Sequence, residues 1–460
     1  MVSDFKTRDE FQRRPLAEKL IKLLVEDITV SPMVVDGPWG SGKTEFILKL
    51  INLFEERHPN YNLIYIDAFK ADHADNPLMT VLAEIIKNLP DSEKQLTIQK
   101  VIPAIRSLSK TVAKTATAWV LKQDAAEVAK DFELEIKEAS DSLIDYSVEK
   151  LLTTHIEAEK DLSALQSLLT EIAKEKPIVL FIDELDRCRP DFSISILETI
   201  KHVFNVPNVQ FVLITNHSQL LASVKHIYGD QLDAKRYLDK FLAFSFNLSA
   251  TVGTNPYHTK LASEVHFINL FRTSGVLKET VFNQPEGKDI IDFGVDLIGN
   301  YSLSLREVET LVRYIEIYHT LSKGFSKNLI IGYGLLRLVG IFIYSFDGKF
   351  AKELDQGIVN AYSIERFFGK DEFVDIQQGK PRSVKQIIFA MFAMESNKHS
   401  NIFNKLDKQT MQERAVQELK QKWDPFFESM LGGSFQYTPN EKNLMHVKSA
   451  IRELMMISEN

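Results

Sequence analysis

The segment Val34–Phe46, which reads VVDGPWGSGKTEF, constrains the fold of this chain more than any other stretch. Within it Gly37, Gly42, Lys43 and Thr44 fit the pattern G-x-x-x-x-G-K-[ST]. Two apolar β-branched residues precede the pattern and an amphipathic helical pattern follows it, which is the strand–loop–helix context in which such loops bind phosphate. The segment therefore predicts an α/β domain that holds a nucleotide at the end of a strand.

The residue types in this loop suit a nucleoside triphosphate. In such a loop the backbone N–H groups surround the α- and β-phosphates, and the helix that begins near Thr44 points its positive end at them. Lys43 would reach the β- and γ-phosphates, and the Thr44 hydroxyl would bind Mg²⁺. The alternative is a glycine-rich strand–helix turn with a solvated lysine. The predicted nucleotide-binding residues of the loop are Gly37, Pro38, Trp39, Gly40, Ser41, Gly42, Lys43 and Thr44.

The composition indicates a globular protein of two or three domains. Its 460 residues are 44% hydrophobic and 26% charged, which is ordinary for such a chain. The net charge of −8 argues against a strongly basic nucleic-acid-binding face overall. Cys188 is the only cysteine, and the first residues contain no apolar run of the signal-peptide type. We therefore expect a cytoplasmic protein in a reducing compartment.

Apolar runs alternate with helical patterns through the first half of the chain, which predicts a parallel sheet flanked by helices. The predicted strands are 33–35, 62–69, 177–183, 208–215 and 242–248, after which the strands stop. The predicted helices of this half include 4–28, 77–89 and 193–203. A charged, glycine-free stretch at 91–176 predicts a helical insertion. The predicted domains are a nucleotide-binding domain at 1–250, a helical lid at 251–345 and a helical C-terminal region at 346–460.

One apolar segment, residues 328–346, is open to two interpretations. It reads NLIIGYGLLRLVGIFIYSF and is almost long enough to span a membrane. A membrane helix would carry Arg337 at its centre, where a charge is expensive. We therefore favour a buried core helix and expect no membrane association.

A second motif completes the predicted nucleotide site. The apolar run that ends in Asp183-Glu184 has the form of a Walker B segment. Asp183 would hold Mg²⁺ and Glu184 would polarise the water that attacks the γ-phosphate. A capping acidic pair is the alternative, but the phosphate loop in the same sheet pattern favours function, because ligands of open α/β sheets bind at the carboxyl ends of the strands. At the end of the next strand, Asn216 is the candidate for orienting the lytic water, with an ordinary loop asparagine as the alternative. The sequence there is not N-K-x-D, so ATP is preferred over GTP.

Around these motifs the chain resembles the KAP family of P-loop NTPases. The segment Asp183–Cys188, DELDRC, is followed closely by Pro190, as in that family's Walker B. The later Tyr237–Phe241, YLDKF, resembles the segment that leads into the family's last strand. The resemblance covers roughly residues 4–320. It departs from the family at Ile66–Phe69, where F-N-A-W is common, and in the 91–176 insertion, which is too charged to be the transmembrane pair of many members.

The resemblance implies ATP and Mg²⁺ as ligands and an oligomerising, AAA-like protein with a helical lid. The segment that begins SLREV at Ser304 resembles the point where the lid returns an arginine, Arg306, to the nucleotide. Arginine fingers of that branch stabilise charge on the γ-phosphate and can come from a neighbouring subunit. Arg187 and Arg236 are the main candidates here. Arg189 and Lys240 are further ones, and a surface ion pair is the alternative for each.

Three functions are compatible with these patterns. The first is an ATPase that acts as an oligomerising switch or motor, and the resemblance links such proteins to bacterial anti-phage defence. Its catalytic residues would be Lys43, Glu184 and Asn216. The second is a nucleotide-gated scaffold that turns over little ATP and recruits a partner protein through its helical C-terminal region. The third is a nucleic-acid-associated ATPase that uses the basic stretch at 379–422, where a solvated helix face is the favoured alternative.

Overall fold

The protein folds into two compact units, Met1–Ser249 and Ala250–Asn460, which are described separately. The structure, a computed structural model, describes residues 4–26, 28–72, 77–88, 163, 166–167, 169–202, 205–253, 259–359, 361–368 and 443–458. Most of the predicted insertion at 91–176 and the whole basic stretch at 379–422 lie outside these residues. The predicted subdivision of the chain into three domains stays a prediction.

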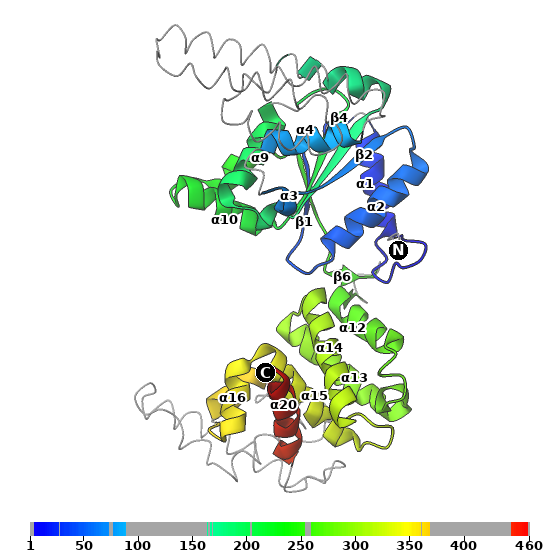
Figure 1. Ribbon diagram of the computed structural model, residues 1–460, viewed down its shortest axis with the longest axis vertical. Helices are drawn as coiled ribbons and strands as arrows, with labels where there is room; N and C mark the ends of the chain where they lie inside the picture. Colours follow the sequence, from blue (N-terminus) through cyan, green and yellow to red (C-terminus); the bar gives the residue numbers. More distant parts are fainter. Residues whose placement is uncertain are drawn as a thin grey trace, which may run out of the picture. The chain divides into compact units, whose positions relative to one another are not determined.

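The first unit is built on a five-stranded sheet whose paired strands all run parallel. The strands are β1 (Met33–Asp36), β2 (Asn62–Asp67), β3 (Ile178–Asp183), β4 (Val209–Thr215) and β5 (Phe244–Asn247). Their order is β2-β3-β4-β1-β5, so β4 separates the phosphate-loop strand from the strand that ends in Asp183 (Figure 1). Because all five strands run the same way, their carboxyl ends meet at one edge, and the predicted α/β fold is confirmed.

Helices cover both faces of this sheet (Figure 1). One face packs against α1 (Arg14–Val25) and α2 (Lys43–Arg57), and the other against α4 (Pro77–Lys87), α9 (Pro190–His202) and α10 (His217–Tyr228). Successive residues of a strand point to opposite faces, so Leu180 joins one hydrophobic cluster and Phe181 joins the other. All six residues of β3 are buried, as expected for a strand that is covered on both faces.

Several predicted boundaries in the first unit are wrong by two or more residues, and side-chain capping explains two of them. The predicted helix at 4–28 begins only at Arg14, and the residues before it form turns, in which Asp9 accepts the backbone N–H groups of Arg13 and Arg14. The predicted strand at 62–69 ends at Asp67, because the Asp67 side chain accepts the Lys70 N–H and caps the short helix α3 (Ala68–Ala71). Local side-chain capping therefore overrides the apolar pattern at both places.

The second unit is mostly helical. Its helices are α12 (Ala262–Thr273), α13 (Lys288–Tyr301), α14 (Leu305–Ser322), α15 (Ile331–Phe346), α16 (Gly348–Gln356), α17 (Ala361–Phe368) and α20 (Asn443–Ser458). The prediction that strands stop after Leu248 is wrong in detail, because β6 (Thr251–Val252) pairs antiparallel with β7 (Lys260–Leu261). A strand of two residues is too short to show the alternation of apolar and polar residues by which strands are predicted.

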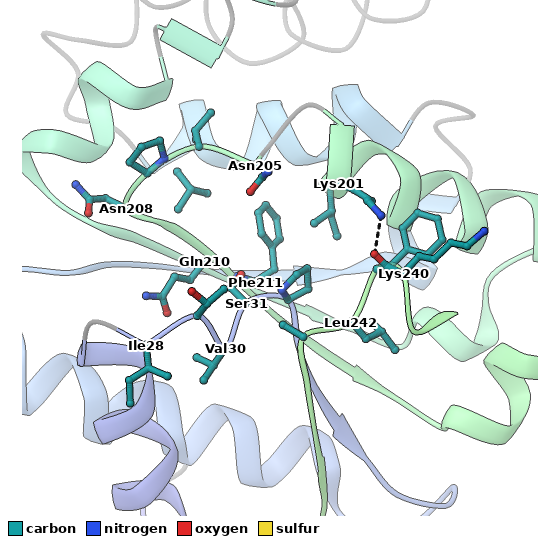
Figure 2. Close-up of a pocket in the computed structure, with 18 residues that line it drawn as sticks. Ile28, Val30, Ser31, Lys201, Asn205, Asn208, Gln210, Phe211, Lys240 and Leu242 are labelled. Carbon is teal, nitrogen blue, oxygen red and sulfur yellow. Dashed lines mark hydrogen bonds between the residues drawn. The ribbon is translucent and has the colours of Figure 1, made fainter. Parts of the chain in front are cut away.

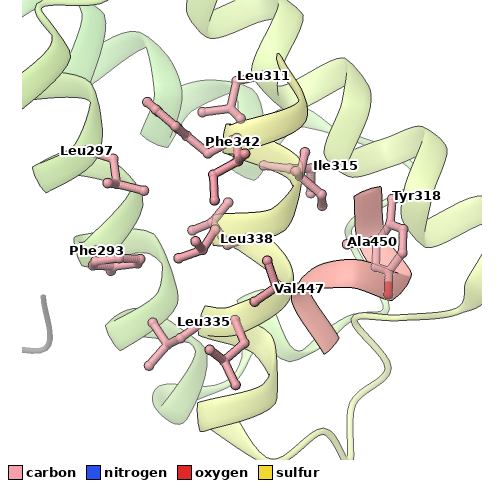
Figure 3. Packing of buried hydrophobic residues seen from close by; sticks show 14 of the residues in the cluster. Phe293, Leu297, Leu311, Ile315, Tyr318, Leu335, Leu338, Phe342, Val447 and Ala450 are labelled. Carbon is pink, nitrogen blue, oxygen red and sulfur yellow. The ribbon is translucent and has the colours of Figure 1, made fainter. Parts of the chain in front are cut away.

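Helix α15 lies in the core of the second unit, packed against α20 and surrounded by α13 and α14 (Figure 3). Gly340 allows this close packing, because a Cβ there would lie 2.6 Å from the Val447 carbonyl oxygen on α20. The Arg337 guanidinium donates a hydrogen bond to the Gly324 carbonyl oxygen, so this charged group has a polar partner within the unit. None of the described helices is long and apolar enough to cross a membrane.

A cavity of about 600 Å³ lies where β1, β4 and β5 begin (Figure 2). The Ser31 hydroxyl oxygen accepts the Phe211 N–H at 2.9 Å on one side of it, and Lys201 donates to the Lys240 carbonyl oxygen at 2.7 Å on another. Because these are the starting ends of parallel strands, the cavity lies at the sheet edge opposite the phosphate loop.

Candidate functional site

The phosphate loop joins the end of β1 at Asp36 to the start of α2 at Lys43. Gly40 and Gly42 have φ angles of 73° and 79°, in the left-handed region that favours glycine. At Gly37 a Cβ would lie 2.9 Å from the Ser41 hydroxyl oxygen, which is the end of a side chain that can turn away. The backbone path of the loop therefore depends on glycine at Gly40 and Gly42.

Arg13, which the sequence did not single out, donates a hydrogen bond to the backbone of this loop. Its guanidinium donates to the Ser41 carbonyl oxygen at 3.0 Å and to the Ser249 carbonyl oxygen at 3.2 Å. It lies 4.9 Å from the centre of the Phe11 ring and is buried, which lowers its pKa to about 10. A buried arginine that donates to backbone oxygens of the loop and of the last residue of the unit ties these two segments together.

Lys43 is buried at the base of the loop. Its ammonium donates to the Gly37 carbonyl oxygen at 2.6 Å and to the Pro38 carbonyl oxygen at 3.2 Å. Burial lowers the pKa of Lys43, and the nearby carboxylates of Asp186 and Asp183 oppose this shift. The ammonium is therefore positioned between the loop and the acidic end of β3, where a phosphate group would be held by its charge.

Asp183 lies at the end of β3 and is only 1% exposed. Its Oδ1 accepts the Glu184 N–H at 2.8 Å, and its Oδ2 accepts the Tyr65 hydroxyl at 2.9 Å. The Thr44 hydroxyl also donates to this carboxylate. Burial raises the pKa of Asp183, and these hydrogen bonds oppose the rise. The fold thus brings together Thr44 and Asp183, the pair that the sequence predicts as magnesium ligands.

The donor set at this point fits magnesium. A threonine hydroxyl and one carboxylate are hard oxygen ligands, and Mg²⁺ in nucleotide sites is usually held by one or two such groups together with the phosphates. Among the described residues no group of three or more His, Cys, Asp or Glu side chains is arranged to hold a metal. Thr44 and Asp183 would therefore supply only part of the ligands of a magnesium ion.

Glu184 follows Asp183 with a φ of 62°, so the chain turns sharply out of the strand. Its carboxylate forms an ion pair with Arg187, three residues later in the short turn η2 (Leu185–Arg187). Burial raises the pKa of Glu184, and the Arg187 guanidinium lowers it. The candidate base is therefore held by an arginine of its own chain, which is one of the two main candidate fingers.

The other basic candidates have partners of their own or lie in the second unit. Arg189 donates three hydrogen bonds to Asp72, from its backbone N, Nε and Nη2. Arg236 forms an exposed ion pair with Asp233, and Lys240 lies 5.8 Å from the centre of the Tyr237 ring. Arg306 lies in the first turn of α14 in the second unit, so its contact with nucleotide stays a prediction.

At the end of β4, the predicted residue Asn216 and the residue before it, Thr215, differ in their hydrogen bonds. Asn216 caps α10, and its side-chain oxygen accepts the Ser218 N–H at 3.2 Å and the Ser218 hydroxyl at 2.7 Å. Thr215 is 0% exposed, and its hydroxyl has no hydrogen-bond partner in the described part of the chain. A polar residue that closes an apolar strand beside β3 is the sequence signal that could have identified Thr215.

A contact across the site links the phosphate loop to the turn after β3. The indole N–H of Trp39 donates to the Asp186 carboxylate, although 147 residues separate the two in sequence. The Trp39 side chain is nevertheless 49% exposed. The sequence predicted Trp39 only as a loop position, because nothing local to either residue reveals this partner.

The sequence of the chain matches the model of the KAP family P-loop domain over residues 13–321. The chain belongs to this family. The match extends from Arg13, below the phosphate loop, to the last turn of α14, and the protein is therefore a nucleotide-binding P-loop protein of the KAP family. The resemblance noted from the Walker B segment is confirmed.

Two other comparisons add little to this KAP-family assignment. No curated protein sequence matches the chain. Among solved structures, that of the Aeropyrum pernix ORC2 protein (ADPNP–ADP complexes) is similar with a TM-score of 0.35 and 13% sequence identity. That similarity covers 92% of this chain and 95% of the other, and it is too weak to support a conclusion about either fold or function.

Proposed function

We propose that this KAP-family protein is a magnesium-dependent ATPase that acts as an oligomerising switch. The observation that carries the proposal is the convergence of Lys43, Thr44, Asp183 and Glu184 at the carboxyl edge of the sheet. The first two come from the start of α2 and the last two from the end of β3. This set combines a cation, two oxygen ligands and a carboxylate base, which together suit phosphoryl transfer to water.

Each residue has a defined task in this reaction. The loop N–H groups and the Lys43 ammonium bind the phosphates of ATP and offset their charge. Thr44 and Asp183 would hold Mg²⁺, which when bound would supply charge neutralisation for the phosphates. Glu184 orients a water molecule in line with the γ-phosphate and accepts its proton as the water oxygen bonds to phosphorus, while the bond from phosphorus to the bridging oxygen breaks and ADP leaves with that oxygen. ATP is preferred over GTP, since the segment after β4 reads TNH and lacks the guanine-reading N-K-x-D pattern.

A direct test is nucleotide binding and ATPase activity of two variants with matched controls. Lys43→Ala should abolish ATP binding, and Glu184→Gln should keep binding but reduce turnover about 100-fold or more, since a positioned base contributes 10²–10⁴-fold. Lys87→Ala and Glu84→Gln change an exposed ion pair on α4 and should leave both properties unchanged. A wild-type protein that neither binds nor hydrolyses ATP would contradict the proposal.

One observation favours the second candidate, a nucleotide-gated scaffold with little turnover. Arg187 holds the Glu184 carboxylate in an ion pair that engages one of its oxygens and opposes the rise in pKa that burial causes, so the pair makes this carboxylate less ready to accept a proton from water. A scaffold of this kind would change mass on ATP binding while the phosphate release of the wild type stays as slow as that of Glu184→Gln. Mass photometry with ATP, together with a phosphate-release assay on the same sample, separates the two functions.

The wider biological role is proposed on family membership. Family membership supports a homo-oligomeric protein that takes part in bacterial anti-phage defence. A cytoplasmic location and the recruitment of a partner protein through the C-terminal helical region belong to the same proposal. The single cysteine, Cys188, is consistent with a reducing compartment. Phage plating on cells that express wild type or Lys43→Ala tests the defence role, because only the nucleotide-binding chain should lower plaque numbers.

A further inference from the structure

A tyrosine on the neighbouring strand contacts the carboxylate that is expected to hold magnesium. The Tyr65 hydroxyl donates to Asp183 Oδ2 at 2.9 Å, from a position 118 residues earlier in the chain. Strands β2 and β3 pair parallel, with Tyr65 opposite Phe181 and Asp67 opposite Asp183. Tyr65 therefore shares a sheet face with Asp183 and reaches it along the diagonal, a distance that an aromatic side chain spans.

The contact completes the set of donors around the carboxylate. Oδ1 of Asp183 accepts the Glu184 N–H at 2.8 Å, while Oδ2 accepts Tyr65. With each oxygen engaged by a donor from a different direction, the carboxylate plane has one favoured orientation. Each oxygen accepts hydrogen bonds at more than one site, so the Thr44 hydroxyl and a metal or its water can still be bound.

We propose that Tyr65 is a positioning residue that fixes the Asp183 carboxylate in the orientation that binds Mg²⁺ with ATP. The inference rests on the proposed nucleotide site, but it concerns metal affinity and not turnover. Partners of this kind, which hold a metal ligand without touching the metal, commonly change metal affinity 10–100-fold when they are removed. A phenylalanine at position 65 would keep the ring and remove only the hydrogen bond.

The test is a magnesium titration of nucleotide binding in the full-length protein. We use a fluorescent ATP analogue with its label on the ribose, and vary the Mg²⁺ concentration at fixed protein and nucleotide. Tyr65→Phe should raise the Mg²⁺ concentration for half-maximal tight binding about 10-fold. Binding of the same analogue in EDTA should stay at the wild-type level, because the phosphate loop itself is unchanged. Saturating Mg²⁺ should restore tight binding.

Tyr237→Phe provides a matched control. The Tyr237 hydroxyl donates to the Glu198 carboxylate at 3.0 Å and is also hydrogen-bonded to the Tyr228 hydroxyl at 3.1 Å, so this variant loses a tyrosine–carboxylate bond outside the phosphate site. Both variants should lower the melting temperature in EDTA by a similar amount. Only Tyr65→Phe should shift the Mg²⁺ titration, since only its carboxylate partner lies beside Thr44.

Two results would overturn the inference, and they differ from failure of the proposed function. If Tyr65→Phe lowers the melting temperature but titrates with Mg²⁺ like wild type, the hydroxyl is only a structural contact. If the wild type binds the analogue equally well with Mg²⁺ and with EDTA, Asp183 does not position a metal. If Lys43→Ala binds the analogue as wild type does, or the wild type binds none, the proposed nucleotide site fails first and the inference falls with it.

Discussion

Arg187 and Glu184 form an ion pair within one turn, immediately after the strand that carries Asp183. The pair joins the candidate base to a candidate arginine finger of the same chain. We expect an arginine engaged in this way to act on its own site, whereas a finger that serves a neighbouring subunit would have to reach outward. An experiment can therefore ask whether the arginine that acts at a site comes from the same subunit or from its neighbour.

We expect Arg187 to act within its own subunit. Arg187→Ala should reduce ATPase activity about tenfold or more, because the Glu184 carboxylate loses the partner that holds it in place. Equal mixing of Arg187→Ala and Glu184→Gln chains should not restore activity, since no site then has both residues from one chain. A finger acting between subunits would give the opposite result, because mixed assemblies would contain sites with an intact base beside an intact arginine. The measurement is phosphate release as a function of mixing ratio.

Thr215 and Asn216 should respond differently to substitution. The Thr215 hydroxyl is buried without a partner among the described residues, so Thr215→Val removes no hydrogen bond of the protein and should leave stability within about 1 kcal/mol. If this hydroxyl orients the lytic water, turnover should fall at least tenfold while ATP binding is kept. Asn216→Ala should instead lower the free energy of unfolding by about 1 kcal/mol through loss of the α10 cap. Urea unfolding and ATPase assays on both variants check this, and equal turnover of Thr215→Val and wild type would rule out the role.

Gly340→Ala should destabilise the second unit. The new methyl group would lie 2.6 Å from the Val447 carbonyl oxygen, so α15 and α20 must separate, at a cost of about 1–3 kcal/mol. Gly348→Ala is the control, because a Cβ at the start of α16 meets no atom within 4 Å. Thermal unfolding should show a lower midpoint for Gly340→Ala only. Equal midpoints would mean that the two helices pack less closely than described.

Cys188 should react slowly with thiol reagents. Burial raises the pKa of its thiol to about 12, and nearby carboxylates led by Asp72 add to the rise. The thiolate is the reactive form, so its fraction at pH 8 is about a thousandfold below that of a thiol with a pKa near 8.5. Native protein should therefore resist alkylation by iodoacetamide at pH 8, whereas protein in guanidinium chloride should react within minutes. Fast labelling of the native chain would contradict the described burial.

The parallel sheet and the phosphate loop could be predicted because their signals are local. Strand β3 is a continuous apolar run, and the loop combines glycines with Lys43 in a fixed spacing. The turns before Arg14 could not be predicted from the apolar spacing. Asp9 accepts the backbone N–H groups of Arg13 and Arg14 where the helix begins, and the apolar spacing does not show where that is. Strands β6 and β7 are too short to leave a pattern.

Side chains that contact each other across the site could not be predicted from the sequence, for a different reason. The Tyr65–Asp183 contact depends on strand pairing and register between residues 118 positions apart. Trp39 and Asp186 meet only because loop and turn project from the same sheet edge. The sequence identified the residue types that carry the chemistry, but not the side chains that hold them in place.

The contact between Trp39 and Asp186 has a practical consequence, because it places an indole ring at the mouth of the phosphate loop. Phosphates that enter beside Lys43 add negative charge close to Asp186, which changes the polarity around that ring and the strength of its hydrogen bond. Tryptophan emission is sensitive to both. The wavelength and intensity of the intrinsic fluorescence therefore offer a label-free signal of loop occupancy, and Trp39→Phe identifies the part of the signal that comes from this ring.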